Sequence, residues 1–273
     1  MPRAGSGAKG GVRRSRAGAA HARVEVRQSR GGRSLRVDGT FASWWRPGTV
    51  RTGSVWDALA APLLWLPLAH RRRILILGLG GGSAARLLRA LAPRARIVGV
   101  ERDAGVLRAA RRHFGLGGLG LDVVQADARE FLARDRHRFD LVIDDVFVGS
   151  GRAVRKPDWL PEPGLEAASR HLAPGGLLVS NAIDEAGGVA RWLGERFARV
   201  LALQVAGYDN RVLVAGPPDL SARGLRAALA AEPLLAPTLP RLRVARVRTI
   251  PERSARLRLP ARRGDASGIP RPA

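Results

Sequence analysis

The middle of the chain alternates between short apolar runs and longer segments with apolar residues on one helical face. Residues 73–77 are an apolar run, a glycine cluster follows at 78–82, and residues 84–92 place leucines at helical spacing. A run of this kind is typical of a strand buried on both faces of a parallel sheet. Apolar residues three and four positions apart predict a helix. The segment therefore predicts a buried strand, a tight turn and a helix.

The same alternation continues to about residue 197. It predicts further strands at 97–100, 121–125, 139–143 and 177–180, and helices at about 104–113, 128–134, 164–172 and 186–197. Residues 200–205 and 211–215 are two strands joined by a linker too short for a crossover helix, so they should form an antiparallel hairpin. We therefore expect an α/β fold with a doubly wound, mostly parallel seven-stranded sheet that ends in this hairpin.

The flanking segments predict smaller elements. Residues 22–28 and 34–38 alternate weakly and should pair as a β-hairpin, and residues 54–66 carry apolar side chains at helical spacing. We divide the chain into a disordered basic tail, a hairpin region, a main α/β domain that ends with a helix at about 222–231, and a Pro/Arg-rich basic tail. Their ranges are 1–20, 21–53, 54–232 and 233–273.

A formal net charge of +24 raises the question of nucleic acid as a partner. About +7 lies in residues 1–30 and about +8 in residues 241–273, so weak nucleic-acid contact through the Arg-rich ends is one alternative. Genome composition is the other. Lys9 and Lys156 are the only lysines, and an excess of Arg, Ala and Gly is typical of GC-rich genomes.

The remaining composition excludes several classes of protein. The chain has no cysteine, which rules out disulfides and thiolate metal sites, and its five histidines show no ligand spacing, so we expect no metal. The N-terminus lacks the apolar core of a secretory signal. The longest apolar run, at 58–69, contains two prolines and is too short to cross a bilayer. We expect a cytoplasmic protein without a membrane partner.

The first candidate site is the glycine-rich loop between the first buried strand and its helix. Glycines let the backbone turn tightly and approach a ligand, and a helix N-terminus offers free N–H groups. The loop fits G-x-G-x-G rather than the dinucleotide fingerprint G-x-G-x-x-G, because its sixth position is serine. This pattern favours S-adenosylmethionine or a relative over NAD. The candidate cofactor residues are Gly78, Gly80, Gly81, Gly82 and Ser83, whose hydroxyl could also cap the helix.

Acidic residues follow the next three strands, and ligands in such sheets bind beyond the carboxyl ends of the strands. Glu101 could accept both ribose hydroxyls. Asp127 could accept the adenine amino group while the Ala128 N–H meets a ring nitrogen, although Asp127 could also cap the following helix. Asp144 and Asp145 are the candidate catalytic pair, because a carboxylate can orient an acceptor or remove its proton.

These motifs together resemble the spermidine-synthase (polyamine aminopropyltransferase) family of the class I methyltransferase superfamily. The likeness covers roughly residues 24–216, from a hairpin ending in Leu-Asp-Gly-like residues 37–39 to the last two strands. In that family the residues corresponding to 78–83 form the glycine loop. Glu101 corresponds to the ribose-binding acid, Asp127 to the adenine-binding acid and Asp144 to the catalytic aspartate. The resemblance implies that S-adenosylmethionine or its decarboxylated form binds to the main domain.

The sequence departs from the family pattern at the positions that hold a polyamine. Gly81 replaces the loop aspartate, and Phe147 replaces the second aspartate after the fourth strand. Residues 55–57 read Val-Trp-Asp where the family has Tyr-His-Glu, and Ala42 stands where it has Gln. Asp57 and Asp145 could replace the lost acids in part.

We therefore expect a transferase that moves a methyl group from S-adenosylmethionine to an unknown small-molecule acceptor. Aminopropyl transfer from decarboxylated S-adenosylmethionine to a polyamine is an alternative. A non-catalytic nucleoside- or nucleic-acid-binding protein is another. A homodimer contact through the N-terminal hairpin, with Trp44, Trp45 and Trp56 nearby, is a further candidate interaction.

Overall fold

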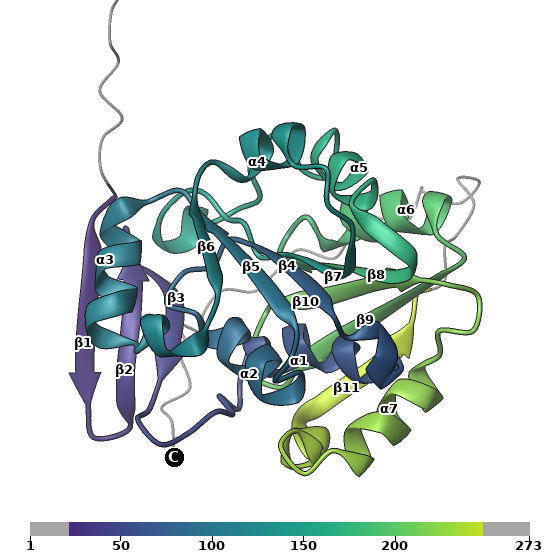
Figure 1. Cartoon of the computed structure of the whole chain (residues 1–273), viewed down its shortest axis with the longest axis horizontal. Coiled ribbons are helices and arrows are strands. Elements are labelled where there is room, and N and C mark those ends of the chain that lie inside the picture. Colours follow the sequence, from purple (N-terminus) through teal and green to yellow (C-terminus); the bar gives the residue numbers. More distant parts are fainter. Residues whose placement is uncertain (1–21, 248–273) are drawn as a thin grey trace, which may run out of the picture.

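The computed structural model describes residues 22–247 of the chain. It contains a small three-stranded antiparallel sheet and a large eight-stranded sheet (Figure 1). The Arg-rich ends, for which we predicted disorder and gave weak nucleic-acid contact as one alternative, lie mostly outside the described residues. Within residues 22–247, no helix has the length and apolar character needed to cross a membrane.

The large sheet has the strand order β11-β9-β10-β8-β7-β4-β5-β6. Strands β4 to β8 are parallel, whereas β10 is antiparallel to both β8 and β9. The strands are β4 (Arg73–Leu77), β5 (Arg96–Glu101), β6 (Asp122–Gln125), β7 (Phe139–Asp144), β8 (Leu172–Ala182), β9 (Arg199–Val205), β10 (Arg211–Gly216) and β11 (Leu242–Arg246). This arrangement confirms the doubly wound fold that ends in an antiparallel hairpin.

Helices cover both faces of the large sheet (Figure 1). One apolar core lies under α1 (Val55–Ala60), α2 (Ser83–Leu91) and α7 (Ala222–Ala231). A second lies under α4 (Ala128–Arg134), α5 (Gly164–Ser169) and α6 (Ala186–Arg196). Continuous apolar strands such as β4 supply alternate side chains to both cores, because successive residues point to opposite faces. The described residues also contain short 3₁₀ helices: η1 (Ala61–Trp65), η2 (Leu68–His70), η3 (Leu116–Leu119), η4 (Gly151–Ala153) and η5 (Ala236–Arg241).

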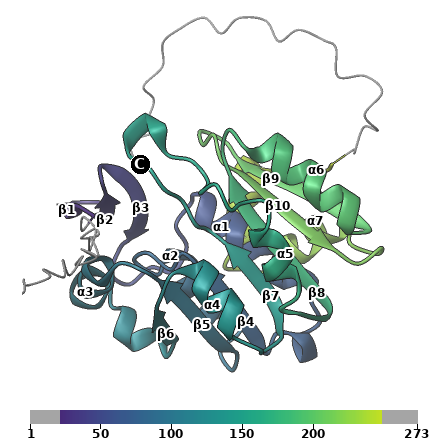
Figure 2. The same ribbon diagram turned by 90° about the horizontal axis from the view of Figure 1, so that it is seen from above.

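The N-terminal sheet consists of β1 (Val24–Ser29), β2 (Gly32–Val37) and β3 (Thr40–Trp45). It packs on α3 (Ala104–His113), beside the carboxyl edge of the large sheet (Figure 2). The hairpin was predicted and the third strand was not. The aromatic residues considered for a dimer contact pack within the chain: Trp56 is buried, and the ring of Trp45 lies 4.4 Å from the Arg86 guanidinium.

Three expectations need correction. The large sheet has eight strands rather than seven, because β11 lies in residues assigned to the basic tail; its buried Leu242 pairs with Val205 of β9. The helix predicted at 54–66 is α1 followed by η1, since Pro62 lacks the N–H that an α-helix would need there. The helix predicted to reach residue 172 ends at Ser169, and β8 begins before the glycines.

Candidate functional site

A cavity of about 290 Å³ lies where the carboxyl ends of the parallel strands meet the N-terminal sheet. Ligands of open α/β sheets bind at this edge, so the fold places the cavity where the sequence predicts a site. We call the part next to β5 and β6 the Glu101 end. The part next to β7, β8 and β10 is the Asp145 end. Among the described residues, the lining holds five acids against one arginine: Asp38, Glu101, Asp103, Asp127, Asp145 and Arg102.

The glycine loop reaches the cavity with only part of its length. Gly78 and Gly80 line the cavity, and both have positive φ, the region that favours glycine. A Cβ at Gly78 would lie 2.5 Å from the backbone oxygen of Asp145, so this position admits no larger residue. Gly78 and Gly80 therefore expose backbone without side chains at the cavity wall.

The rest of the loop is covered by β3. The Gly81 N–H donates to the Ser43 hydroxyl at 2.7 Å. The Ser83 hydroxyl accepts from the Trp44 N–H at 3.0 Å and donates to the Trp44 carbonyl at 2.8 Å. Gly81, Gly82 and Ser83 consequently do not line the cavity. The expectation that Ser83 caps the helix is wrong, because Gly82 occupies the N-cap position and the hydroxyl is committed to β3.

Glu101 joins the glycine loop to the end of β5. Its carboxylate accepts the Gly80 N–H and the Asp103 N–H, each at 3.0 Å, and it also faces the cavity. Burial raises the pKa of Glu101, and the backbone hydrogen bonds oppose that shift. Each carboxylate oxygen can accept more than one hydrogen bond, so the side chain can hold the loop and still bind a donor from a ligand.

Asp127 and Ala128 lie at the same end of the cavity, at the start of α4. The Asp127 carboxylate accepts the Arg129 N–H at 2.8 Å, so it does cap the helix as one alternative foresaw. Gly78, Gly80, Glu101, Asp127 and Ala128 are thus brought together around one end of the cavity, although they come from three separate strand–helix connections.

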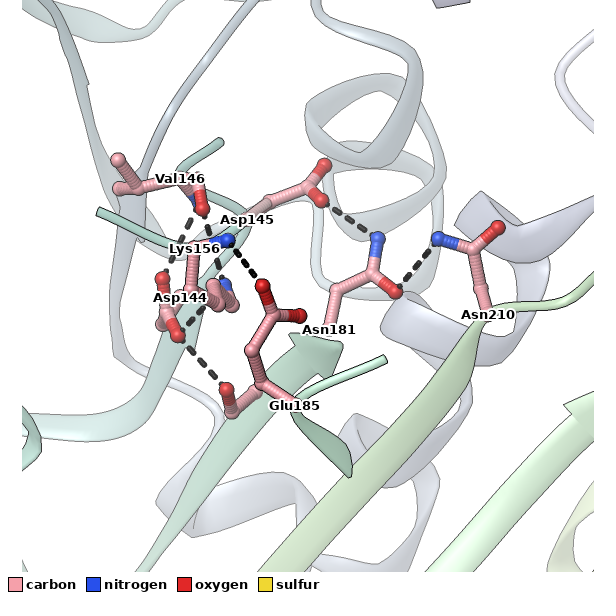
Figure 3. A network of polar contacts seen from close by, with 8 residues as sticks. Asp144, Asp145, Val146, Lys156, Asn181, Glu185 and Asn210 are labelled. Atoms are coloured by element: carbon pink, nitrogen blue, oxygen red, sulfur yellow. Dashed lines mark hydrogen bonds and ion pairs between the residues drawn. The ribbon is translucent and has the colours of Figure 1, made fainter. Parts of the chain in front are cut away.

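Asp144 does not line the cavity. Its carboxylate is 1% exposed, and its Oδ2 accepts from the Lys156 ammonium at 2.8 Å and from the Ser180 hydroxyl at 2.7 Å (Figure 3). The other oxygen accepts the Val146 N–H at 3.1 Å. This acid is therefore occupied by a buried ion pair, and a ligand in the cavity has no access to it.

Asp145 is the acid of the pair that lines the cavity. Its Oδ1 accepts from the Asn181 amide at 2.7 Å, and the Asn181 oxygen accepts in turn from the Asn210 amide at 3.0 Å (Figure 3). Burial raises the pKa of Asp145 to about 7, against the lowering effects of the Asn181 hydrogen bond and the Lys156 charge. A carboxyl group with this pKa can both accept and release a proton near neutral pH.

Aromatic and apolar side chains line the cavity around Asp145. Phe41 and Trp56 pack with their ring centroids 5.3 Å apart, and Phe147 and Trp159 line the cavity from the segment after β7. Asp145 is the acid that the ends of β7, β8 and β10 contribute to the described lining.

Asp57, considered as a replacement for a lost family acid, points away from the cavity. It is 1% exposed and accepts the N–H groups of Thr52 and Gly53, each at 2.9 Å. Its carboxylate also accepts the hydroxyls of Thr52 and Thr238. The side chain holds a turn to η5 and is not available to a substrate.

Four polar residues around the two aspartates were not predicted from the sequence: Lys156, Ser180, Asn181 and Asn210. Lys156 carried a usable signal, because it is one of two lysines among 47 basic residues. Ser180 and Asn181 also interrupt the apolar run of β8 at its carboxyl end, where sites are built. Asn210 lies in the β9–β10 connection and had no comparable signal.

The chain is similar to known proteins with a methyltransferase fold. Residues 74–176 match a family model described as a methyltransferase domain. A probable spermidine synthase from Corynebacterium glutamicum superposes with a TM-score of 0.64 at 19% identity, covering 88% of this chain and 96% of that one. The chain therefore carries a domain of the class I methyltransferase fold.

Curated relatives narrow this class. A probable polyamine aminopropyl transferase of Bifidobacterium longum is 30% identical over 178 residues, which are 61% of this chain and 38% of the relative. A 4-amino-L-phenylalanine/4-methylamino-L-phenylalanine methyltransferase of Streptomyces pristinaespiralis is 32% identical over 118 residues, 37% of this chain and 40% of the relative. Over these segments the chain is similar to both kinds of transferase, and it spans less than half the length of these curated relatives.

Proposed function

We propose that the chain transfers the methyl group of S-adenosylmethionine to an amine or hydroxyl acceptor held beside Asp145. The observation that carries this proposal is the Asp145 end of the cavity, where one carboxylate faces inward among amides and aromatic rings. The name of the Streptomyces pristinaespiralis relative adds support, because it describes methyl transfer to an aromatic amine.

The Glu101 end suits the nucleoside of the cofactor. Glu101 would accept the ribose hydroxyls, and Asp127 with the Ala128 N–H would bind the adenine edge. Bare backbone at Gly78 and Gly80 allows the amino-acid part of the cofactor to approach closely. The lining acids also favour a sulfonium cation electrostatically in a chain that is otherwise strongly basic.

In the proposed reaction a lone pair of the acceptor attacks the methyl carbon, and the carbon–sulfur bond breaks. The bonding electrons stay on sulfur, which leaves neutral S-adenosylhomocysteine. The acceptor's proton passes to Asp145, whose pKa of about 7 suits a general base. Asn181 and Asn210 fix the orientation of that carboxylate, and positioning of the two reactants supplies most of the remaining rate enhancement.

Aminopropyl transfer to a polyamine is the alternative that the names of the other curated relatives suggest. A diamine carries two ammonium groups and needs an acid for each. Of the acids near the end of β7, Asp145 faces the cavity, whereas Asp57 is buried among Thr52, Gly53 and Thr238 and Asp144 is paired with Lys156. The site therefore supports an acceptor with one reacting nitrogen or oxygen and an apolar body.

The test compares the two donors on purified protein. S-adenosylmethionine is offered with a panel of aromatic and aliphatic monoamines and alcohols, and release of S-adenosylhomocysteine is measured. Decarboxylated S-adenosylmethionine is offered with putrescine, and spermidine is measured. We expect methyl transfer that Asp145→Asn abolishes, and negligible spermidine. Spermidine formation near the common enzyme range of roughly 1–10³ s⁻¹ would overturn the proposal.

A further inference from the structure

The segment between β7 and α5 forms one wall of the Asp145 end. We call residues 146–159 the acceptor wall, because seven of them line the cavity: Val146, Phe147, Val148, Gly149, Val154, Pro157 and Trp159. The wall doubles back on itself, with Val148 and Arg155 exchanging backbone hydrogen bonds of 2.8 and 2.9 Å. This local pairing shapes the wall but does not attach it to the large sheet.

Lys156 provides that attachment. Its side chain is 1% exposed, and its ammonium donates to Asp144 at 2.8 Å and to the Val146 carbonyl at 3.1 Å (Figure 3). The ammonium also lies 4.5 Å from the centroid of the Phe147 ring. The Lys156 N–H donates to Glu185 at 2.8 Å. Lys156 thus joins the end of β7, the Val146 carbonyl at the start of the wall and the N-cap of α6.

We propose that Lys156 is a positioning residue: its buried ammonium neutralises Asp144, holds the acceptor wall against the sheet and leaves Asp145 as the acid that meets the acceptor. The assignment of an acceptor to this cavity rests on the proposed function. The anchoring and the charge effect do not, because both follow from contacts within the chain.

The residue type supports the proposal. Arginine supplies all but two of the 47 basic residues, yet this buried position holds a lysine. A guanidinium is a planar fork that needs several acceptors in one plane, whereas an ammonium is compact and fits a small pocket with acceptors in different directions. Asp144, the Val146 carbonyl and the Phe147 ring surround Lys156 in this way.

Lys156 also acts on Asp145 through its charge. The charged groups that act on this carboxyl are Lys156, which lowers its pKa, and Asp144, which raises it, with the Lys156 effect the larger of the two. Asn181 and Trp56 contribute hydrogen bonds that lower the pKa. Removing both members of the ion pair should therefore leave Asp145 with a higher pKa than in the wild type.

The experiment compares the double variant Asp144→Asn/Lys156→Met with Glu185→Ala and the wild type. The double variant removes the ion pair without leaving a buried charge unpaired, so it should fold. Glu185→Ala removes only the backbone attachment of Lys156. Asp158→Asn is the matched control, because it breaks an exposed ion pair with Arg155 in the same wall.

Three measurements separate the outcomes. We expect protease cleavage within residues 146–159 to become roughly tenfold faster in the double variant and in Glu185→Ala, because cleavage follows the population of the open form. In carbon-13 NMR, the titration midpoint of Asp145 should rise in the double variant alone. Calorimetry should show unchanged affinity for S-adenosylhomocysteine in each variant.

A wall that stays protected in both variants, or an Asp145 midpoint that falls or stays constant in the double variant, would refute the role of Lys156. If the wild type bound no S-adenosylhomocysteine and methylated no acceptor, the proposed function would fail. The proteolysis and NMR results would still decide whether Lys156 anchors the wall.

Discussion

Replacing Asp57 tests whether this acid is a structural residue or a substrate-binding one. Its carboxylate accepts four hydrogen bonds, two from backbone N–H groups and two from threonine hydroxyls. The Thr52 hydroxyl also contacts Ser54 at 2.9 Å and can pair with it instead. The cost of Asp57→Ala therefore comes mainly from the buried N–H groups of Thr52 and Gly53, which would lose their acceptor.

Each buried donor left without a partner costs about 1–3 kcal/mol, so we expect Asp57→Ala to lower the free energy of unfolding by about 3–5 kcal/mol. Asp57→Asn should cost about half as much, because one oxygen still accepts the Thr52 donors while the amide group opposes the Gly53 N–H. Thr238→Val removes a single hydrogen bond to a charged group and should cost about 1.5–3 kcal/mol.

Urea unfolding of the three variants measures these differences, with the exposed Asp219→Ala as the control. Affinity for S-adenosylhomocysteine should not change, since Asp57 does not line the cavity. A variant Asp57→Ala that is as stable as the control but has altered affinity for putrescine or for an amine acceptor would show that this acid binds substrate.

Three further predictions concern the cavity and the glycine loop. Glu101→Gln should weaken S-adenosylhomocysteine binding by about 1.5–3 kcal/mol in calorimetry. The exposed Glu130→Gln is the control and should bind as the wild type does. If Glu101→Gln also bound with wild-type affinity, Glu101 would not belong to the site. Methyl transfer should rise with pH around a midpoint near 7. As the pH rises from about 4 to 7, the free energy of unfolding should fall, because the folded state keeps the Asp145 proton that the unfolded state has lost. Asp145→Asn should abolish the rise in methyl transfer and reduce the slope of stability, to which Glu101 also contributes because burial raises its pKa; an unchanged slope would assign it to other groups. Gly81→Asp, which restores the family residue, should destabilise the fold by about 1–3 kcal/mol, since its Cβ would lie 2.8 Å from the Ser43 Cβ. Ser43→Gly/Gly81→Asp should recover part of that loss in urea unfolding, and a fully stable single variant would contradict the packing argument.

The sequence by itself determined the sheet and the edge at which the site lies. Apolar runs such as residues 73–77 are readable because a strand covered on both faces has few polar residues to interrupt it. The acids Glu101, Asp127 and Asp145 were found because each lies within two residues of the carboxyl end of a strand, and parallel strands end at one edge. Local pattern and chain direction are sufficient for these inferences.

Contacts between distant segments decided the rest. β11 and β3 were missed because each is defined as a strand by its partners, β9 for β11 and β2 for β3, which the local sequence does not reveal. Asp144 is buried in an ion pair and Asp145 faces the cavity. This difference depends on Lys156, twelve residues after Asp144, and on Ser180 and Asn181 in β8. From the sequence, Asp57 could have bound a substrate. In the structure its carboxylate accepts a hydrogen bond from the hydroxyl of Thr238, 181 residues away. A side chain's availability depends on which donors the fold places beside it, and adjacent residues in a sequence do not carry that information.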